Sequence, residues 1–271
     1  MSRLHVLGPS LRAWLADPAG PGHPNAGVIV DDDGITVVDA LTTPTQAAAL
    51  AAELETLDAR VRRVVLTSSH AEYCGGTSAF GLAAIYGTAQ ISSYLDLPPN
   101  PEGLARLYPD LGDELDELVT RPVSHLVSEP AWLSPTAVAV PIAGQIAENL
   151  VVQVPDAGVV FAGALGSFGV TPLAFDGDPV AWAAALDRVL ELGSVIVPGH
   201  GHVGGEPEVR VQQEYLGACA AAGGDPSALA PGPWSDWPGQ AFHAVNVERA
   251  ARLAAGDDGV PVAMLDLLGL G

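Results

Sequence analysis

Two short loops of this 271-residue chain carry side chains that could exchange protons. The first loop, residues 67–76, reads Thr-Ser-Ser-His-Ala-Glu-Tyr-Cys-Gly-Gly, and the second, residues 198–202, reads Pro-Gly-His-Gly-His. Imidazole, carboxyl and phenol groups serve as general acids and bases, and hydroxyl groups form hydrogen bonds. The two loops therefore predict acid–base chemistry if the fold brings them together.

Each of these loops follows a short β-branched run. Residues 61–66 read as a buried strand that ends at the first loop, and residues 195–197 run directly into the second loop. The first loop therefore lies at the C-terminal end of the strand that precedes it.

The rest of the chain alternates strand and helix signals. The turn Asp31-Asp32-Asp33-Gly34 predicts a hairpin between strands 26–30 and 35–39. We expect further strands at 84–86, 137–142, 150–154 and 159–162. Helices are expected from Pro44, at 78–82, from the N-cap Asp178, at 207–221 and at 242–254.

Residues 95–130 differ from their surroundings because they are rich in proline and acid. Leucines recur at helical spacing over 104–118, and Pro109 interrupts them, which predicts two short amphipathic helices. We interpret 95–130 as a lid insertion and 206–271 as a C-terminal helical extension of one domain that spans 1–271.

Composition narrows the function classes. The chain has 11 Lys+Arg against 32 Asp+Glu and a net charge of −21, which disfavours nucleic-acid partners. No apolar run approaches the ~20 residues needed to span a bilayer, so we expect a cytoplasmic protein without a membrane partner. Cys74 and Cys219 have no metal-finger spacing and are expected to be reduced and buried. A small-molecule substrate fits best, and a homo-oligomer is compatible with the sequence.

Four motifs in order carry a resemblance to a known family. Residues 67–76 resemble the metal-binding loop of the metallo-β-lactamase superfamily, Thr-His-x-His-x-Asp-His-x-Gly-Gly. Residues 25–39 are similar to its paired opening strands, with Asp39 at an acidic position beside the site. Phe161-Ala162-Gly163 resembles the Phe-Ala-Gly-Asp strand end, and residues 197–201 the terminal Pro-Gly-His-Gly loop. The resemblance implies an α+β fold, a four-layer αββα sandwich, and also covers the C-terminal helices of hydrolase-like and cyclase-like members.

Most metal-ligand positions that this resemblance assigns hold other residues. Ser68, Tyr73 and Gln145 stand at histidine positions, Ala164 at the bridging aspartate and Glu72 at another aspartate, whereas His70 and His200 are retained. Zinc and iron need several deprotonated N, S or O donors. We therefore expect no metal and no other cofactor.

Three hypotheses follow. The first is a metal-independent enzyme in which His70, Glu72, Tyr73 and His200 are catalytic and Ser68, Gln145, Cys74 and His202 bind the substrate. It would catalyse elimination, isomerisation, cyclisation or acyl hydrolysis of a small organic molecule. The second is a non-catalytic pseudoenzyme that binds a small molecule or a partner. The third is a hydrolase with a single weak metal held by His70, Glu72 and His200.

Overall fold

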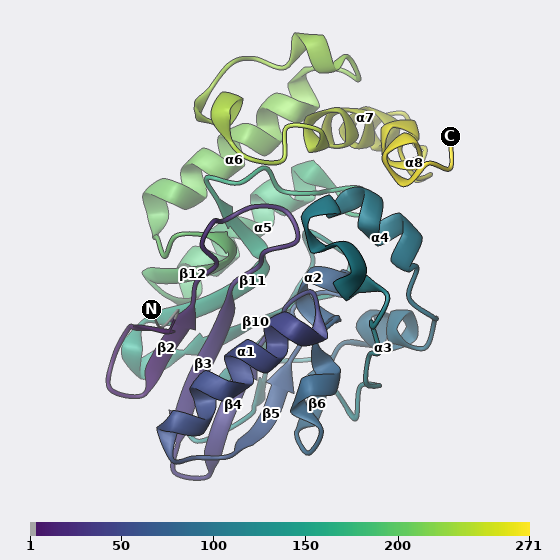
Figure 1. Ribbon diagram of the computed structural model, residues 1–271. Coiled ribbons are helices and arrows are strands. Elements are labelled where there is room, and N and C mark those ends of the chain that lie inside the picture. The colour runs from purple at the N-terminus through teal and green to yellow at the C-terminus, as the bar shows by residue number, and fades with distance from the viewer. Residues whose placement is uncertain (1–3) are drawn as a thin grey trace.

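The computed structural model describes residues 4–271, which form two β-sheets with helices on their outer faces (Figure 1). The first sheet has the order β1 (Leu4–Val6), β2 (Leu11–Trp14), β3 (Ala26–Asp31), β4 (Gly34–Val38), β5 (Val61–Val65), β6 (Ala84–Gly87) and β7 (His125–Leu126). The second has the order β12 (Val195–Gly201), β11 (Val159–Phe168), β10 (Asn149–Val154), β9 (Val138–Ile142) and β8 (Ala131–Trp132). Strands β4 to β7 pair in parallel, as do β11 and β12.

The central apolar core lies between the two sheets. Val38 and Val65 of the first sheet share one buried cluster with Val152 and Phe161 of the second, because alternate side chains of each strand point to the same face. A Cβ atom at position 27 would lie 2.3 Å from Cδ1 of Phe161, so only glycine permits this close approach. The sheets are thus packed face to face.

Helices complete the outer layers. α1 (Pro44–Leu54) and α3 (Ala89–Leu95) pack on the first sheet, and α5 (Pro179–Leu192) and α6 (Glu206–Ala221) on the second. Thr43, Thr88 and Asp178 begin three of these helices by accepting backbone N–H bonds. α7 (Phe242–Ala254) packs on α6, and α8 (Val262–Leu268) on α7. The expected αββα sandwich with C-terminal helices is confirmed.

The remaining helical segments are short. They are α2 (Ala71–Cys74), α4 (Pro101–Leu107) and 3-10 turns at Glu55–Leu57, Thr77–Phe80, Pro109–Leu115, Pro155–Ala157, Pro226–Ala228 and Pro233–Asp236. Within 95–130, α4 and the turn Pro109–Leu115 match the two predicted helices and bury Tyr108, Leu111, Leu115 and Leu118 in one cluster. No helix of residues 4–271 is long and apolar enough to cross a membrane.

Three local features depart from the sequence-based expectation. Where a helix was expected at 78–82, the chain forms the 3-10 turn Thr77–Phe80, which ends at Gly81. The strands β1 and β2 precede the predicted hairpin and extend the first sheet. β11 continues beyond residue 162 to Phe168, because the positive φ of Gly163, 48°, shifts the register without ending the strand.

Candidate functional site

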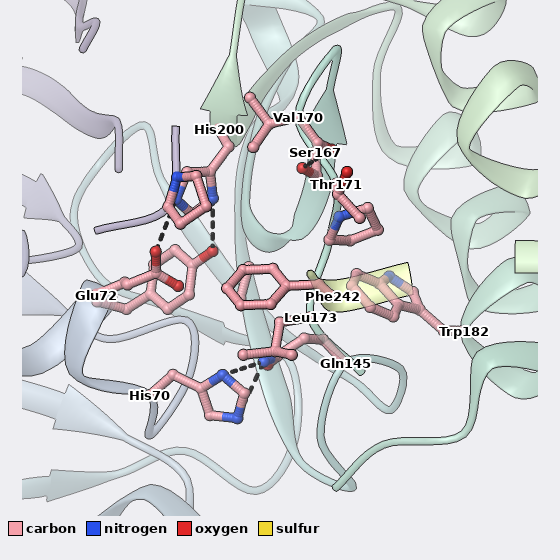
Figure 2. A pocket seen from close by; sticks show the side chains of 14 residues that line it. His70, Glu72, Gln145, Ser167, Val170, Thr171, Leu173, Trp182, His200 and Phe242 are labelled. Atoms are coloured by element: carbon pink, nitrogen blue, oxygen red, sulfur yellow. Dashed lines mark hydrogen bonds and ion pairs between the residues drawn. The ribbon is translucent and has the colours of Figure 1, made fainter. Parts of the chain in front are cut away.

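The two predicted loops meet at one edge of the sandwich. His70 immediately precedes α2, and His200 lies near the end of β12; both residues are 6% exposed. With Glu72, Tyr73 and Gln145 they line a cavity of about 20 Å³, which has room for about one water molecule (Figure 2). The fold therefore gathers all four predicted catalytic side chains.

Gln145 is oriented by a fixed set of hydrogen bonds. The backbone N–H of Ile146 donates to Oδ1 of Asn149 over 2.9 Å, so the Asn149 amide must present its NH₂ group on the other side. Nδ2 of Asn149 then donates to Oε1 of Gln145 over 3.2 Å, and the Ser68 hydroxyl donates to the same oxygen over 2.8 Å. Gln145 must therefore point its NH₂ group at His70.

This orientation defines the proton position on His70. Nε2 of Gln145 lies 2.6 Å from Nδ1 of His70 and 3.1 Å from its Nε2, and since the amide nitrogen only donates, the shorter contact assigns Nδ1 as the acceptor (Figure 2). The ring proton then resides on Nε2, which donates to Oδ1 of Asp176 over 3.0 Å. Phe175 stacks on the imidazole with ring centroids 4.8 Å apart. In its neutral form, His70 thus has a carboxylate behind its N–H and its basic nitrogen facing an amide.

Opposing effects act on the basicity of His70. Burial favours the neutral ring, but the charge and hydrogen bond of Asp176, with a smaller effect of Glu72, hold the pKa of His70 above its ordinary value. Protonation of Nδ1 would put two donors face to face unless Gln145 turned away. Proton uptake by His70 is therefore coupled to movement of Gln145.

The second histidine forms a separate relay. Oε1 of Glu72 accepts from the backbone N–H of Gly22 over 2.7 Å and lies 3.0 Å from Nε2 of His200. Burial opposes the charge of Glu72, yet His200 and the Gly22 N–H outweigh it and lower the pKa of Glu72. An ionised Glu72 fixes the proton on Nε2 of His200, so Nδ1 accepts from the Tyr73 hydroxyl over 3.2 Å (Figure 2). Burial first, then the charges of Glu72 and Asp39, raise the pKa of Tyr73, which keeps that phenol protonated.

The predicted substrate-binding residues lie in different places. Ser68 is fully buried behind Gln145, and Gln145 itself lines the small cavity. Cys74 is buried, donates to the carbonyls of Ser69 and His70, and has its pKa raised to about 12 by burial, so it is no nucleophile. His202 lies outside the cavity, is largely exposed and sits 3.7 Å from Glu208.

Asp176 is a site residue that sequence reasoning did not find. It lies in the loop between β11 and α5, two positions before the N-cap Asp178, and its side chain is about a third exposed, at 32%. The pattern Phe-Asp-Gly-Asp before a helix signals a cap and gives no sign of contact with a loop more than a hundred residues away. Only the contact of that loop with His70, just before α2, shows that the two side chains pair.

The donor set does not fit the metal pair implied by the resemblance. Among residues 4–271 no group of three or more His, Cys, Asp or Glu side chains is placed to hold an ion, and this includes the trio His70, Glu72 and His200. At the assigned positions, Gln145 turns its NH₂ group towards His70, Tyr73 is a protonated phenol and Ala164 offers no donor. Burial raises the pKa of Asp39 to about 8, against the two hydrogen bonds it accepts from Thr67.

Comparison with known proteins agrees with the fold and the motifs. The fold is similar to the metallo-β-lactamase FIM-1 from Pseudomonas aeruginosa in its mono-zinc form, with a TM-score of 0.60 and 19% identity over 79% of this chain and 94% of that one. It is equally similar to a metallo-β-lactamase from Erythrobacter litoralis, with a TM-score of 0.60 and 19% identity over 79% and 95% of the two chains. A double mutant of the sec-alkyl sulfatase PisA1 has a TM-score of 0.70 and 14% identity over 95% of this chain but only 51% of its own. A family model described as the metallo-beta-lactamase superfamily matches residues 19–205, more than half of the sequence, and the chain therefore belongs to the metallo-β-lactamase superfamily.

Proposed function

We propose that this chain is an enzyme that needs no metal and removes a proton from a small organic substrate, with His70 as the general base. The observation that carries the proposal is the hydrogen-bond chain from Asn149 through Gln145 and His70 to Asp176. It leaves the lone pair of His70 on Nδ1, at the small cavity, while a carboxylate stabilises the imidazolium that would form.

The other side chains have matching roles. A substrate group that enters the cavity would displace the Gln145 amide from Nδ1 and give its proton to His70. The amide of Gln145 and the phenol of Tyr73 both line the cavity and can donate to the negative charge that develops on a substrate oxygen. Glu72 and His200 hold the Tyr73 phenol in place. Elimination, isomerisation, cyclisation and acyl hydrolysis all begin with or require such a proton transfer.

A substrate-free measurement tests the central feature. Nitrogen-15 chemical shifts of labelled histidine report which ring nitrogen carries the proton, and we expect the proton of His70 on Nε2 at pH 8. A His70→Ala variant assigns the signal. A proton on Nδ1 would refute the proposed base, because that nitrogen would then have no lone pair for the substrate.

Activity is measured on chelator-treated protein with two probe reactions, deuterium exchange at the α-carbon of 1-tetralone and hydrolysis of aryl esters. His70→Ala should lower the rate by about 10² to 10⁴. The matched control is His125→Ala, since His125 lies on the edge strand β7, stacked on Tyr86 and away from the cavity. Full activity of a folded variant that lacks both His70 and His200 would exclude the mechanism.

A second candidate function, a binding protein without catalysis, is favoured by one specific observation. Both ring nitrogens of His70 and both of His200 already have hydrogen-bond partners. If Gln145 does not move, neither histidine has a free nitrogen for a substrate. Normal ligand binding combined with no proton exchange in either probe reaction would select this function.

A further inference from the structure

A second and larger cavity lies on the other side of His70. It has a volume of about 230 Å³ and is enclosed by α2, α3, α4, α8 and the loop between β11 and α5. Figure 1 shows α4 and α8 side by side above α2 and α3. Its apolar walls include Leu95, Leu104, Leu107, Leu118, Phe175 and Met264. None of the described residues that line it is Asp, Glu, Lys or Arg.

The size of this cavity indicates a small molecule and excludes a peptide or a second chain. An apolar cavity of ~150 Å³ admits benzene. The present cavity is about one and a half times as large, which matches a bicyclic ring system. It also has far more room than the 20 Å³ cavity beside His200.

The two cavities share a wall. His70 and Leu173 line both of them, so a molecule in the large cavity lies against a residue that also lines the small cavity. The remaining polar groups of the large cavity include the side chains of Asn100 and Thr120 and the phenols of Tyr94 and Tyr108. Burial is the main cause that raises the pKa of both phenols, so all these groups are uncharged near neutral pH. A ligand therefore meets mostly hydrocarbon and a few uncharged polar groups, and it lies against His70.

The entrance of the large cavity is apolar as well. Tyr94 and Leu97 line the cavity and are nevertheless 49% and 61% exposed. Exposed apolar side chains at the rim of a cavity are typical of binding sites for apolar ligands. An ammonium that entered would find no carboxylate on the walls, and a carboxylate would find only His70, whose charge is already paired with Asp176. The burial of an unpaired charge is strongly unfavourable.

We propose that this cavity binds an uncharged small molecule with an apolar body about the size of two fused six-membered rings and one hydrogen-bonding group that meets the uncharged polar side chains of the wall. This proposal concerns the class of ligand that binds. It rests on the proposed function only if the bound ligand is also the substrate. Binding itself requires only the cavity and its mostly apolar walls.

The test uses three naphthalene probes of the same shape and different charge. Isothermal titration calorimetry at pH 7 compares 2-naphthol, which is neutral, with 2-naphthoate and 2-naphthylmethylamine, which carry opposite charges. We expect 2-naphthol to bind one molecule per chain, and each charged probe to bind at least tenfold more weakly. Tighter binding of either charged probe would overturn the proposed ligand class.

A cavity-filling variant tests the location. Leu104→Trp extends an indole from α4 into the cavity and should weaken 2-naphthol binding at least tenfold. The matched control Leu82→Trp adds the same ring at a fully exposed site in a distant turn and should leave the affinity unchanged. If circular dichroism shows that Leu104→Trp is unfolded, Thr120→Trp takes its place. Equal affinity in the filled variant and the parent would place the binding elsewhere and refute the proposal.

The outcomes separate this proposal from the proposed function. If 2-naphthol does not bind, the cavity has been misassigned, although His70 can still carry its proton on Nε2. If 2-naphthol binds as expected and the probe reactions show no proton exchange, the ligand class stands and catalysis by His70 does not.

Discussion

Asp176→Asn is the substitution that separates the effects acting on His70. It keeps the shape of the side chain and an oxygen for the Nε2 proton but removes the charge that lies 3.0 Å from the imidazole. Burial then dominates, so the pKa of His70 should fall from above its ordinary value. Because Asp176 is about a third exposed, solvent screens part of its charge, so the fall in the pKa of His70 is smaller than the loss of a fully buried carboxylate would cause.

The same change has a stability signature whose sign follows from the raised pKa. A histidine with a raised folded-state pKa stabilises the fold fully below about pH 6.5, and this contribution disappears as the pH rises through the folded-state value. The loss of unfolding free energy in Asp176→Asn should therefore be about 1 kcal/mol larger at pH 5 than at pH 9. Urea unfolding at both pH values measures it.

The assay for the pKa is an NMR titration of labelled histidine, assigned with His70→Ala. The control is Asp178→Asn, which makes the same charge change two residues away, and asparagine also serves as an N-cap for α5. This control should move the pKa of His70 much less. An unchanged or increased pKa of His70 in Asp176→Asn would refute the pairing of these two side chains.

Four further outcomes follow from the site and its surroundings. Glu72→Gln should lower the free energy of unfolding by about 2 kcal/mol at pH 7 and by less at pH 3, measured by urea unfolding. The lowered pKa of Glu72 stabilises the fold at pH values above the ordinary pKa of a carboxyl group, and this stabilisation disappears as the pH falls through the folded-state pKa. Asp39→Asn should raise the free energy of unfolding by up to about 4 kcal/mol at pH 7 and by little at pH 4. In the folded chain the Asp39 carboxyl keeps its proton up to about pH 8, whereas in the unfolded chain it has released that proton at pH 7. An equal effect at both pH values would contradict this. Elemental analysis should find far less than one transition-metal ion per chain, with a Tm that chelator does not change; stoichiometric zinc, iron or manganese would overturn the metal-free mechanism. Residues 104–118 should exchange amide hydrogens faster than the sheets and slow down with 2-naphthol bound; protection equal to the sheets and unaffected by the ligand would make them a fixed element and not a lid.

The fold was predictable because its signals are local. The hairpin turn Asp31-Asp32-Asp33-Gly34 and the cap at Asp178 each determine an element by themselves, and both occur as expected. The strand β11 was cut short because Gly163 reads as a strand end, whereas its positive φ produces a register shift inside the strand. The edge strand β1 is three residues long and mostly exposed, so it has no buried pattern to detect.

The site was predictable only to the extent that motifs place it. His70, Glu72, Tyr73 and His200 lie in two loops that the strands bring to one edge, and the structure gathers them. The pairing within the group depends on tertiary packing. Loop 169–178 brings Asp176 to His70, which leaves Glu72 to His200, and no spacing in the sequence contains that choice.

The residues that replace the usual ligands form an interdependent set, and this argues against a metal site that has merely lost its ion. Ser68 donates to Gln145, and Gln145 donates to His70, so each substituted side chain provides a hydrogen-bond partner for its neighbour. The side chain of Ala164 is uncharged and needs no counter-ion. Its backbone N–H donates to the Thr67 hydroxyl, which in turn donates to Asp39 over 2.9 Å. A histidine in place of Gln145 alone would remove the common acceptor of the Ser68 hydroxyl and of one Asn149 N–H, although the other Asn149 N–H keeps the Thr67 carbonyl. A buried polar group without a partner costs about 1–3 kcal/mol. Return to a metal site would thus require several simultaneous changes, since each one alone breaks a satisfied network before it gains a ligand.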